Sequence, residues 1–202
     1  METAGQALLA EKKGAHRIEL CAHLEWDGLT PSDDLVFNTL SSLSIPVMAM
    51  LRCRKGDFVY SSGDLEEMKN TVIFLENAGV HGIVFGGLLK NNEIDFDSLH
   101  QIASASKKLP LTFHKAIDLT PDPLQSLKLL VKEKVVSTVL TSGGPGSAWD
   151  NRQTLKKMVD FGKENNLTVL VAGGVRHDNL AVLHAYVNAT AYHGRKIVGD
   201  LS

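Results

Sequence analysis

Seven short apolar runs, each followed by a stretch with helical spacing, recur along the 202 residues of this chain. Strands that alternate with helical patterns indicate βαβ units and therefore a parallel sheet. The runs cover residues 17–21, 47–53, 82–86, 111–115, 137–142, 168–173 and 190–194. This order predicts an α/β fold of the (β/α)8 TIM-barrel type, in which side chains at the carboxyl ends of the strands converge on one mouth.

The number of strands falls one short of a complete barrel, which has eight strands and about 250 residues. Residues 1–16 are rich in alanine and have apolar residues at helical spacing, which predicts a helix. We therefore predict a single barrel domain over residues 1–202 that lacks the first strand and most of the last helix. The neighbours of a missing strand have unpaired edges, which must pair with each other, with another chain or with solvent, and we predict a homo-oligomer or marginal stability.

Candidate helix starts come after the predicted strands. Thr30 comes before a proline at residue 31 and an acid at residue 33, residues 61–64 have the pattern of an N-cap with an acid three residues later, and Asp122 comes before a proline. Ser147 and Asp178 are predicted to start the next two helices. Each strand but the last thus has its own helix.

The composition excludes several classes of partner. With 21 basic and 23 acidic residues, a formal net charge of -2 and no basic run, the chain lacks the charge pattern of proteins that bind nucleic acid or anionic membranes. The apolar stretches are strand-sized, shorter than the roughly 20 residues of a membrane-spanning helix. Two cysteines do not make a disulfide framework. We expect a cytoplasmic protein.

Side-chain alternation along the strands selects the candidate site residues. Glu19 and Cys21 share the face opposite to the purely apolar one, which the helices should cover. Arg52 and Arg54 also share a face, and they should reach solvent at the mouth because burying an unpaired arginine costs several kcal/mol. Cys53 then points toward the helices.

Several strand ends carry groups suited to proton transfer or to anion binding. His114 and Asp118 form a possible proton-transfer pair, with Glu19 as a further candidate, although such a pair is also a common loop hydrogen bond. Arg52 and Arg54 suit an anionic ligand, and they equally suit a solvated rim.

Two glycine pairs at strand ends predict anion cradles, because backbone N–H groups without neighbouring Cβ atoms approach an oxyanion closely. The candidates are Ser142, Gly143 and Gly144 after one strand, and Gly173 and Gly174 after the next. Glycine pairs also serve tight turns with no ligand, and that interpretation remains open.

Six segments in this order resemble the copper homeostasis protein CutC family: GAHRIELCAHLEWDGLTPS, MLRCRKGDFVYS, GIVFG, LTFHKAID, VLTSGG and AGGV. The resemblance implies a (β/α)8 barrel, a cytoplasmic and often oligomeric protein linked to copper handling, and a copper(I) ligand at the cysteine of RIELC. Cys21 occupies that position, and soft thiolates do prefer Cu(I). His114 and His193 are candidates to complete such a site.

The chain also departs from the family pattern. Cys53 and Lys55 stand within a segment that the family writes as Arg-Pro-Arg-Gly-Gly-Asp. The family's first strand, where some members carry a second cysteine, has no counterpart here.

Two functions remain open at this point. One is a copper homeostasis protein that binds Cu(I) at Cys21. The other is an enzyme or sensor for a small phosphorylated or carboxylated metabolite, held by the arginines and glycine loops. A (β/α)8 fold does not decide between them, since such barrels host many chemistries.

Overall fold

The computed structural model describes residues 1–201, which form two compact units. The first unit comprises Met1–Phe85, Phe96–Leu111 and the residues from Asp200. The second comprises Gly86–Asp95 and Thr112–Gly199. Parallel strands alternate with helices in both units.

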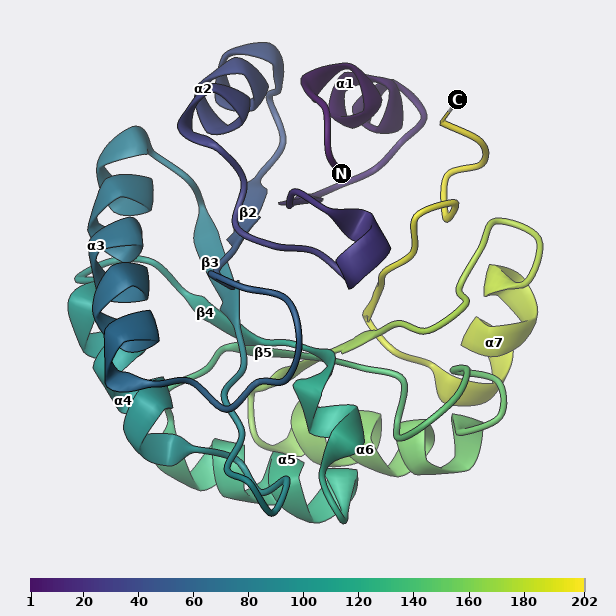
Figure 1. Cartoon of the computed structure of the whole chain (residues 1–202). Helices are drawn as coiled ribbons and strands as arrows, with labels where there is room; N and C mark the ends of the chain where they lie inside the picture. The colour runs from purple at the N-terminus through teal and green to yellow at the C-terminus, as the bar shows by residue number, and fades with distance from the viewer. Residues whose placement is uncertain (202) are drawn as a thin grey trace. The chain divides into compact units, whose positions relative to one another are not determined.

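The first unit contains three strands that pair in sequence order. Its elements are α1 (Ala4–Lys12), β1 (Ile18–Leu20), η1 (Leu24–Trp26), α2 (Asp33–Ser42), β2 (Val47–Met50), α3 (Ser62–Ala78), β3 (Gly82–Phe85) and α4 (Phe96–Ala105). β1 pairs with β2, and β2 pairs with β3, both in parallel. α1 packs against α2, and α3 packs against α4 (Figure 1).

The longest helix, α3, shows how local sequence defines these elements. Ser61 accepts a hydrogen bond from the N–H of Asp64, and the Asp64 carboxylate accepts one from the N–H of Ser61, which is a capping box. Gly79 ends the helix with a φ of 91°. Buried residues recur at helical spacing between these ends, at Leu65, Met68, Val72 and Leu75.

The second unit contains the remaining strand pairs. Its elements are β4 (Leu111–Phe113), η2 (Lys115–Leu119), α5 (Pro123–Glu133), β5 (Thr138–Thr141), α6 (Arg152–Glu164), β6 (Thr168–Val171), α7 (Leu180–Val187) and β7 (Ala191–Tyr192). β4 pairs with β5, β5 with β6 and β6 with β7, all in parallel. Leu140, Leu170 and Ala172 form a buried apolar cluster against which Ala191 packs.

The chain therefore has a TIM-barrel-like α/β fold, as its sequence predicts. Over residues 1–201 there are seven strands, and each strand except β7 is followed by a helix. The helix predicted within residues 1–16 is α1, with Thr3 as its N-cap. That the chain forms a single domain stays a prediction.

Three predicted helix starts are wrong by a few residues. α2 begins at Asp33 with Ser32 as its N-cap, rather than with Thr30 as its N-cap. α6 begins at Arg152 and α7 at Leu180, rather than at Ser147 and Asp178. The Ser147 hydroxyl donates to Asp150 at 2.5 Å, and the N–H of Asp150 donates back to Ser147 at 3.2 Å. This reciprocal pair closes a turn that lies before the helix, so its sequence pattern resembles a helix start.

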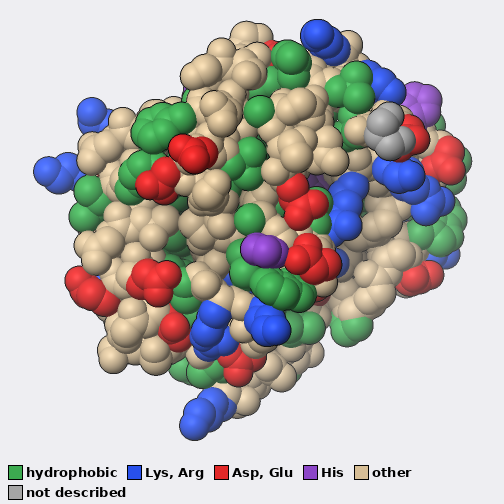
Figure 2. Space-filling model, turned by 45° about the horizontal axis from the view of Figure 1, so that its top comes forward, with side chains coloured by type: hydrophobic (Ala, Val, Ile, Leu, Met, Phe, Trp, Pro, Cys, Tyr) green, Lys and Arg blue, Asp and Glu red, His purple; other side chains and the backbone are tan. Residues whose placement is uncertain are grey.

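The surface has mixed charge, as the composition predicts. On the face drawn in Figure 2, Lys and Arg side chains are interspersed with Asp and Glu side chains. Among the residues described, none of the helices combines the length and apolar character that crossing a membrane requires.

Candidate functional site

Cys21 lies directly after β1 and is buried, with 5% of its surface exposed. After η1 the chain returns past it at Gly28, whose φ of 94° is one that glycine adopts readily. A Cβ on residue 28 would lie 3.4 Å from the Sγ of Cys21 and 3.4 Å from the Cε of Met50. The thiol of Cys21 and the thioether side chain of Met50 therefore both lie against Gly28.

Glu19, on β1 two residues before Cys21, has an ionic partner nearby. Its carboxylate lies 3.2 Å from Nη2 of Arg17, and its side chain is only 10% exposed. The N–H of Cys21 donates to the carbonyl of Met1 at 3.0 Å. This places Glu19 in a structural ion pair, which leaves its predicted role in proton transfer untested.

Arg52 does not reach solvent, contrary to the prediction from sequence. It is 5% exposed, and its guanidinium donates to the carbonyls of Trp26 at 2.6 Å and Gly56 at 2.7 Å, with Gly28 at 3.4 Å. The ring of Phe58 lies 4.7 Å below the guanidinium carbon. Burial is tolerated because main-chain carbonyls and an aromatic face replace water.

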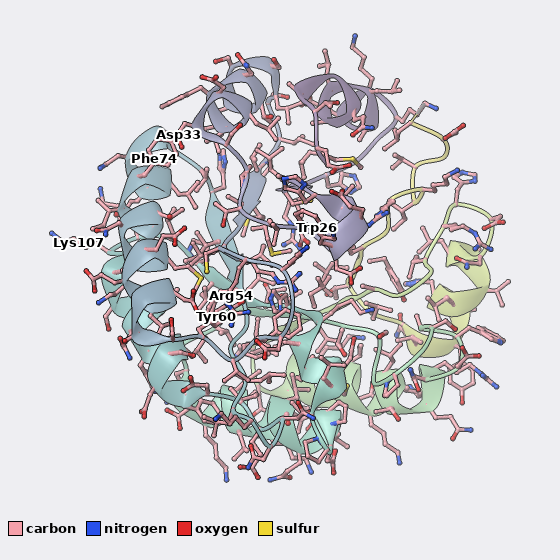
Figure 3. All side chains as sticks on the ribbon, in the orientation of Figure 1. Trp26, Asp33, Arg54, Tyr60, Phe74 and Lys107 are labelled. Atoms are coloured by element: carbon pink, nitrogen blue, oxygen red, sulfur yellow. The ribbon has the colours of Figure 1, made fainter. Side chains whose placement is uncertain are left out.

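Arg54 stays partly exposed, as predicted, and is held by two carboxylates. Its Nη2 lies 3.0 Å from Asp57, and its Nε lies 3.2 Å from Asp64. The hydrogen bond with Asp57 raises the pKa of Arg54, against the effect of partial burial. The guanidinium also lies over the ring of Tyr60, 5.6 Å from its centre (Figure 3). The negative charges of Asp57 and Asp64 offset the positive charge of Arg54, which weakens its attraction for an anionic ligand.

Cys53 points toward α3, as predicted from side-chain alternation. Its Sγ lies 3.8 Å from Oδ1 of Asp64, in the first turn of that helix. Burial, and then the negative charge of Asp64, raise the pKa of the Cys53 thiol to about 11. Cys53 is thus held as a neutral thiol at physiological pH, which disfavours metal binding there.

In the second unit, the loop after β5 binds a carboxylate of the chain itself. Asp118 is buried, and it accepts hydrogen bonds from the hydroxyl of Thr141 at 2.5 Å and the N–H of Gly144 at 3.1 Å. The N–H and hydroxyl of Ser142 donate to it at 2.9 and 2.6 Å. Gly143 and Gly144 have φ values of 80° and 135°. The donors of this loop therefore bind Asp118, and that the loop binds an anionic ligand stays a prediction.

His114 is buried at the end of β4, beside a glycine that the sequence analysis did not single out. Its Nδ1 accepts a hydrogen bond from the N–H of Ala116 at 3.2 Å. A Cβ on Gly86 would lie 2.5 Å from that Nδ1, so residue 86 must be glycine for the imidazole to occupy this place. The proton-transfer role predicted for His114 and Asp118 stays a prediction.

The second glycine pair lies after β6 and borders a cavity of about 430 Å³. Gly173 and Gly174 have φ values of 94° and 74°. A Cβ on Gly173 would lie 2.6 Å from the Cβ of Ser142, so the loops after β5 and β6 touch. Arg176 and Trp149 line the same cavity, and sequence reasoning missed both. The position of Arg176, two residues after a glycine pair at a strand end, is the signal that could have found it.

The predicted residues thus fall into two groups, one in each unit. The first unit contains Glu19, Cys21, Arg52 and Arg54. The second unit contains His114, Asp118 and both glycine loops. That the two groups converge on one mouth stays a prediction. Within residues 1–201 no three His, Cys, Asp or Glu side chains are grouped so that they could hold a metal ion.

Comparison with known proteins places these observations in a family. A family model described as CutC family matches residues 1–198. The chain is 34% identical over 193 residues to a human protein named copper homeostasis protein cutC homolog, covering 96% of this chain and 70% of that protein. It is 35% identical over 173 residues to a CutC family protein of Histophilus somni, covering 86% of this chain and 70% of the other.

Solved structures agree with this assignment. A CutC crystal structure from Streptococcus agalactiae superposes with a TM-score of 0.84 at 29% identity, covering 90% of this chain and 89% of that one. An N-acetylneuraminate lyase from Mycoplasma synoviae superposes with a TM-score of 0.65 at 10% identity, covering 98% of this chain and 64% of the other. The second likeness shows the fold alone.

Proposed function

This chain belongs to the CutC family, and on that premise we propose that it is a copper homeostasis protein that binds Cu(I) as cargo through Cys21. The observation that supports this proposal is that a buried thiol and the methyl end of a thioether side chain both lie against Gly28. Thiolate and thioether sulfurs are the donors that Cu(I) prefers. Cys21 is the first ligand in this proposal and Met50 the second.

The surroundings of the two cysteines support Cys21 rather than Cys53 as the ligand. A metal-bound cysteine must lose its proton, and the raised pKa of Cys53 opposes that loss. Asp64 lies beside Cys53, and its hydrogen bonds to Ser61 and Arg54 hold it there. The two cysteines therefore form a matched pair in which one is expected to bind copper and the other is not.

A competition titration of the reduced protein with Cu(I) and a chromogenic Cu(I) chelator tests the proposal. Cys21→Ser should weaken the affinity by roughly a hundred-fold or more, because it removes the thiolate. Cys53→Ser is the control and should leave the affinity unchanged. Equal affinity of the native protein and Cys21→Ser would overturn the assignment of Cys21.

A second substitution tests the thioether. Met50→Leu keeps the apolar volume and removes the sulfur, so it should weaken Cu(I) binding by about ten-fold while the unfolding midpoint in urea stays close to that of the native protein. If Met50→Leu binds Cu(I) as tightly as the native chain, the second donor lies elsewhere.

We also propose that the protein is a cytoplasmic homo-oligomer. The two cysteines are both free thiols, as suits a reducing compartment, and the resemblance to the family points the same way. Light scattering coupled to size exclusion measures the assembly, and a monomer at micromolar concentration would contradict it. Fractionation of cells followed by immunoblotting measures the location.

A further inference from the structure

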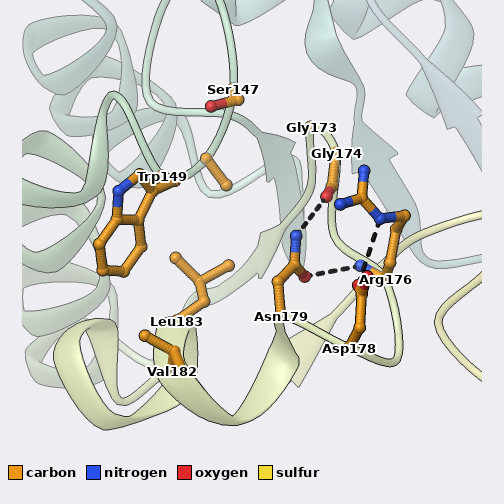
Figure 4. A pocket seen from close by; sticks show the side chains of 10 residues that line it. Ser147, Trp149, Gly173, Gly174, Arg176, Asp178, Asn179, Val182 and Leu183 are labelled. Carbon is orange, nitrogen blue, oxygen red and sulfur yellow. Dashed lines mark hydrogen bonds and ion pairs between the residues drawn. The ribbon is translucent and has the colours of Figure 1, made fainter.

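The cavity beside the loop after β6 has a polar end and an apolar end (Figure 4). Gly173, Gly174 and Arg176 line the polar end, and Trp149 and Val182 line the apolar end. Its volume of about 430 Å³ lies within the range of small-molecule sites, about 300–1,000 Å³. All of these residues belong to the second unit, so the cavity is independent of Cys21.

The polar end has hydrogen-bond donors that remain available. Among the residues described, the N–H groups of Gly173 and Gly174 have no hydrogen-bond partner. Asp178 lies 3.2 Å from Nε of Arg176, which leaves both terminal nitrogens of the guanidinium without a partner within residues 1–201. Two backbone donors and a guanidinium are suited to a carboxylate or a phosphate group.

The loop after β5 provides an internal precedent for this chemistry. There a strand also ends in two glycines with positive φ, and its donors bind the carboxylate of Asp118. The loop after β6 has the same pair of glycines, and within residues 1–201 no carboxylate of the chain binds their N–H groups; Asp178 binds only Nε of Arg176. Asn179 keeps this loop in place, because its amide donates to the carbonyl of Gly174 at 2.8 Å and accepts from the N–H of Arg176 at 2.8 Å.

The apolar end adds a requirement on the rest of the ligand. Trp149 is 45% exposed although it lines the cavity, and Arg152 lies over its ring at 4.5 Å. Val182 is 59% exposed and Leu183 is buried at the same end. A flat or apolar group of a ligand would cover the indole ring and the aliphatic side chains, and removing this apolar surface from water would favour binding.

We propose that this cavity binds a small organic anion, with its carboxylate or phosphate on Gly173, Gly174 and Arg176 and a flat apolar body against Trp149. This site is separate from the copper site proposed above, so an experiment can refute either proposal without affecting the other. Phosphate esters and carboxylates share the chemistry that these donors recognise, so two probes are needed to distinguish them.

Isothermal titration calorimetry with phenyl phosphate and with benzoate tests the proposal, with inorganic phosphate as the probe for the anionic end alone. Arg176→Gln should weaken the binding of the tighter probe by about ten- to a hundred-fold, because a hydrogen bond to a charged group is lost. Lys157→Gln makes the same charge change at an exposed residue outside the cavity and should have no effect.

Trp149→Ala tests the apolar end. It should weaken phenyl phosphate or benzoate by about five-fold and leave inorganic phosphate unchanged. Thermal unfolding followed by circular dichroism establishes that each variant is folded. Absence of binding by both aromatic probes at millimolar concentration would overturn the proposal. So would unchanged binding in Arg176→Gln.

Discussion

The carboxylate of Asp118 organises the loop after β5, and its removal should cost more stability than its neutralisation. In Asp118→Ala, the N–H groups of Ser142 and Gly144 and the hydroxyl of Thr141 lose their acceptor in a buried place. Each buried donor left without a partner costs about 1–3 kcal/mol, so the free energy of unfolding should fall by about 4 kcal/mol. The serine hydroxyl keeps a second acceptor, the carbonyl of Gly144 at 2.9 Å.

Asp118→Asn should be milder, because the amide oxygen can keep the contacts that Oδ1 now makes with Thr141 and Gly144. The amide nitrogen can donate to the hydroxyl of Ser142. We expect this variant to lose only about 1–2 kcal/mol.

Urea unfolding followed by circular dichroism measures the loss of stability in both variants. Asp122→Ala is the control, because Asp122 is exposed and makes a single N-cap bond to Gln125, worth about 1 kcal/mol. If Asp118→Ala and Asp118→Asn lose the same free energy, or if both match the control, the hydrogen bonds of Asp118 do not stabilise the loop as we argue.

Four further predictions concern the first unit. Gly28→Ala should destabilise the protein by about 1–2 kcal/mol more than Gly14→Ala in urea unfolding, because both glycines have a φ of 94° but only at residue 28 would the new Cβ contact other side chains. Arg52→Lys should lower the unfolding free energy by roughly 3 kcal/mol, since an ammonium cannot reach the same carbonyls; a loss below about 0.5 kcal/mol would refute this role. In a Cys21→Ser background, alkylation of Cys53 by iodoacetamide should be slow at pH 8 and should keep accelerating up to about pH 11, and Asp64→Asn should accelerate it at pH 8. In the folded state Cys53 keeps a proton that the unfolded thiol loses near its ordinary pKa. Cys53 should therefore reduce the free energy of unfolding as the pH rises from about 9 to 11. A free energy of unfolding that is constant over this range would contradict the raised pKa of Cys53.

The strands and most helices could be predicted because their signals are local. Apolar runs of five to seven residues predict the strands, and the pair formed by Ser61 and Asp64 defines the start of α3 within four residues. A similar local signal at Ser147 was misleading, because its bonds to Asp150 close a turn rather than start a helix. Local pattern thus determines that the chain bends there, and packing determines whether a helix begins at the bend or a few residues later.

The site residues were harder to predict because their partners are distant in sequence. The sequence predicts that Ser142 and Gly144 bind an anionic ligand, and this stays a prediction. In the structure their donors bind the carboxylate of Asp118, more than twenty positions earlier. The sequence shows no partner for Arg52 and so predicts that it reaches solvent. Its acceptors are the carbonyls of Trp26 and Gly56, and sequence periodicity does not predict the loop conformations that bring them to Arg52. The sequence predicts which residues supply donors and charges, but it does not predict which groups of the same chain bind them.

The buried guanidinium of Arg52 has a consequence for how the surroundings of Cys21 arise during folding. It joins the end of η1, the turn at Gly28 and the carbonyl of Gly56. The segment that contains Cys21 therefore does not acquire its surroundings alone, but only after β2 and the loop beyond it have been synthesised and have folded back. A peptide ending before Val47 would carry Cys21, Met1 and Gly28 but would lack Met50, which lies against Gly28, and Arg52, which binds the turn there.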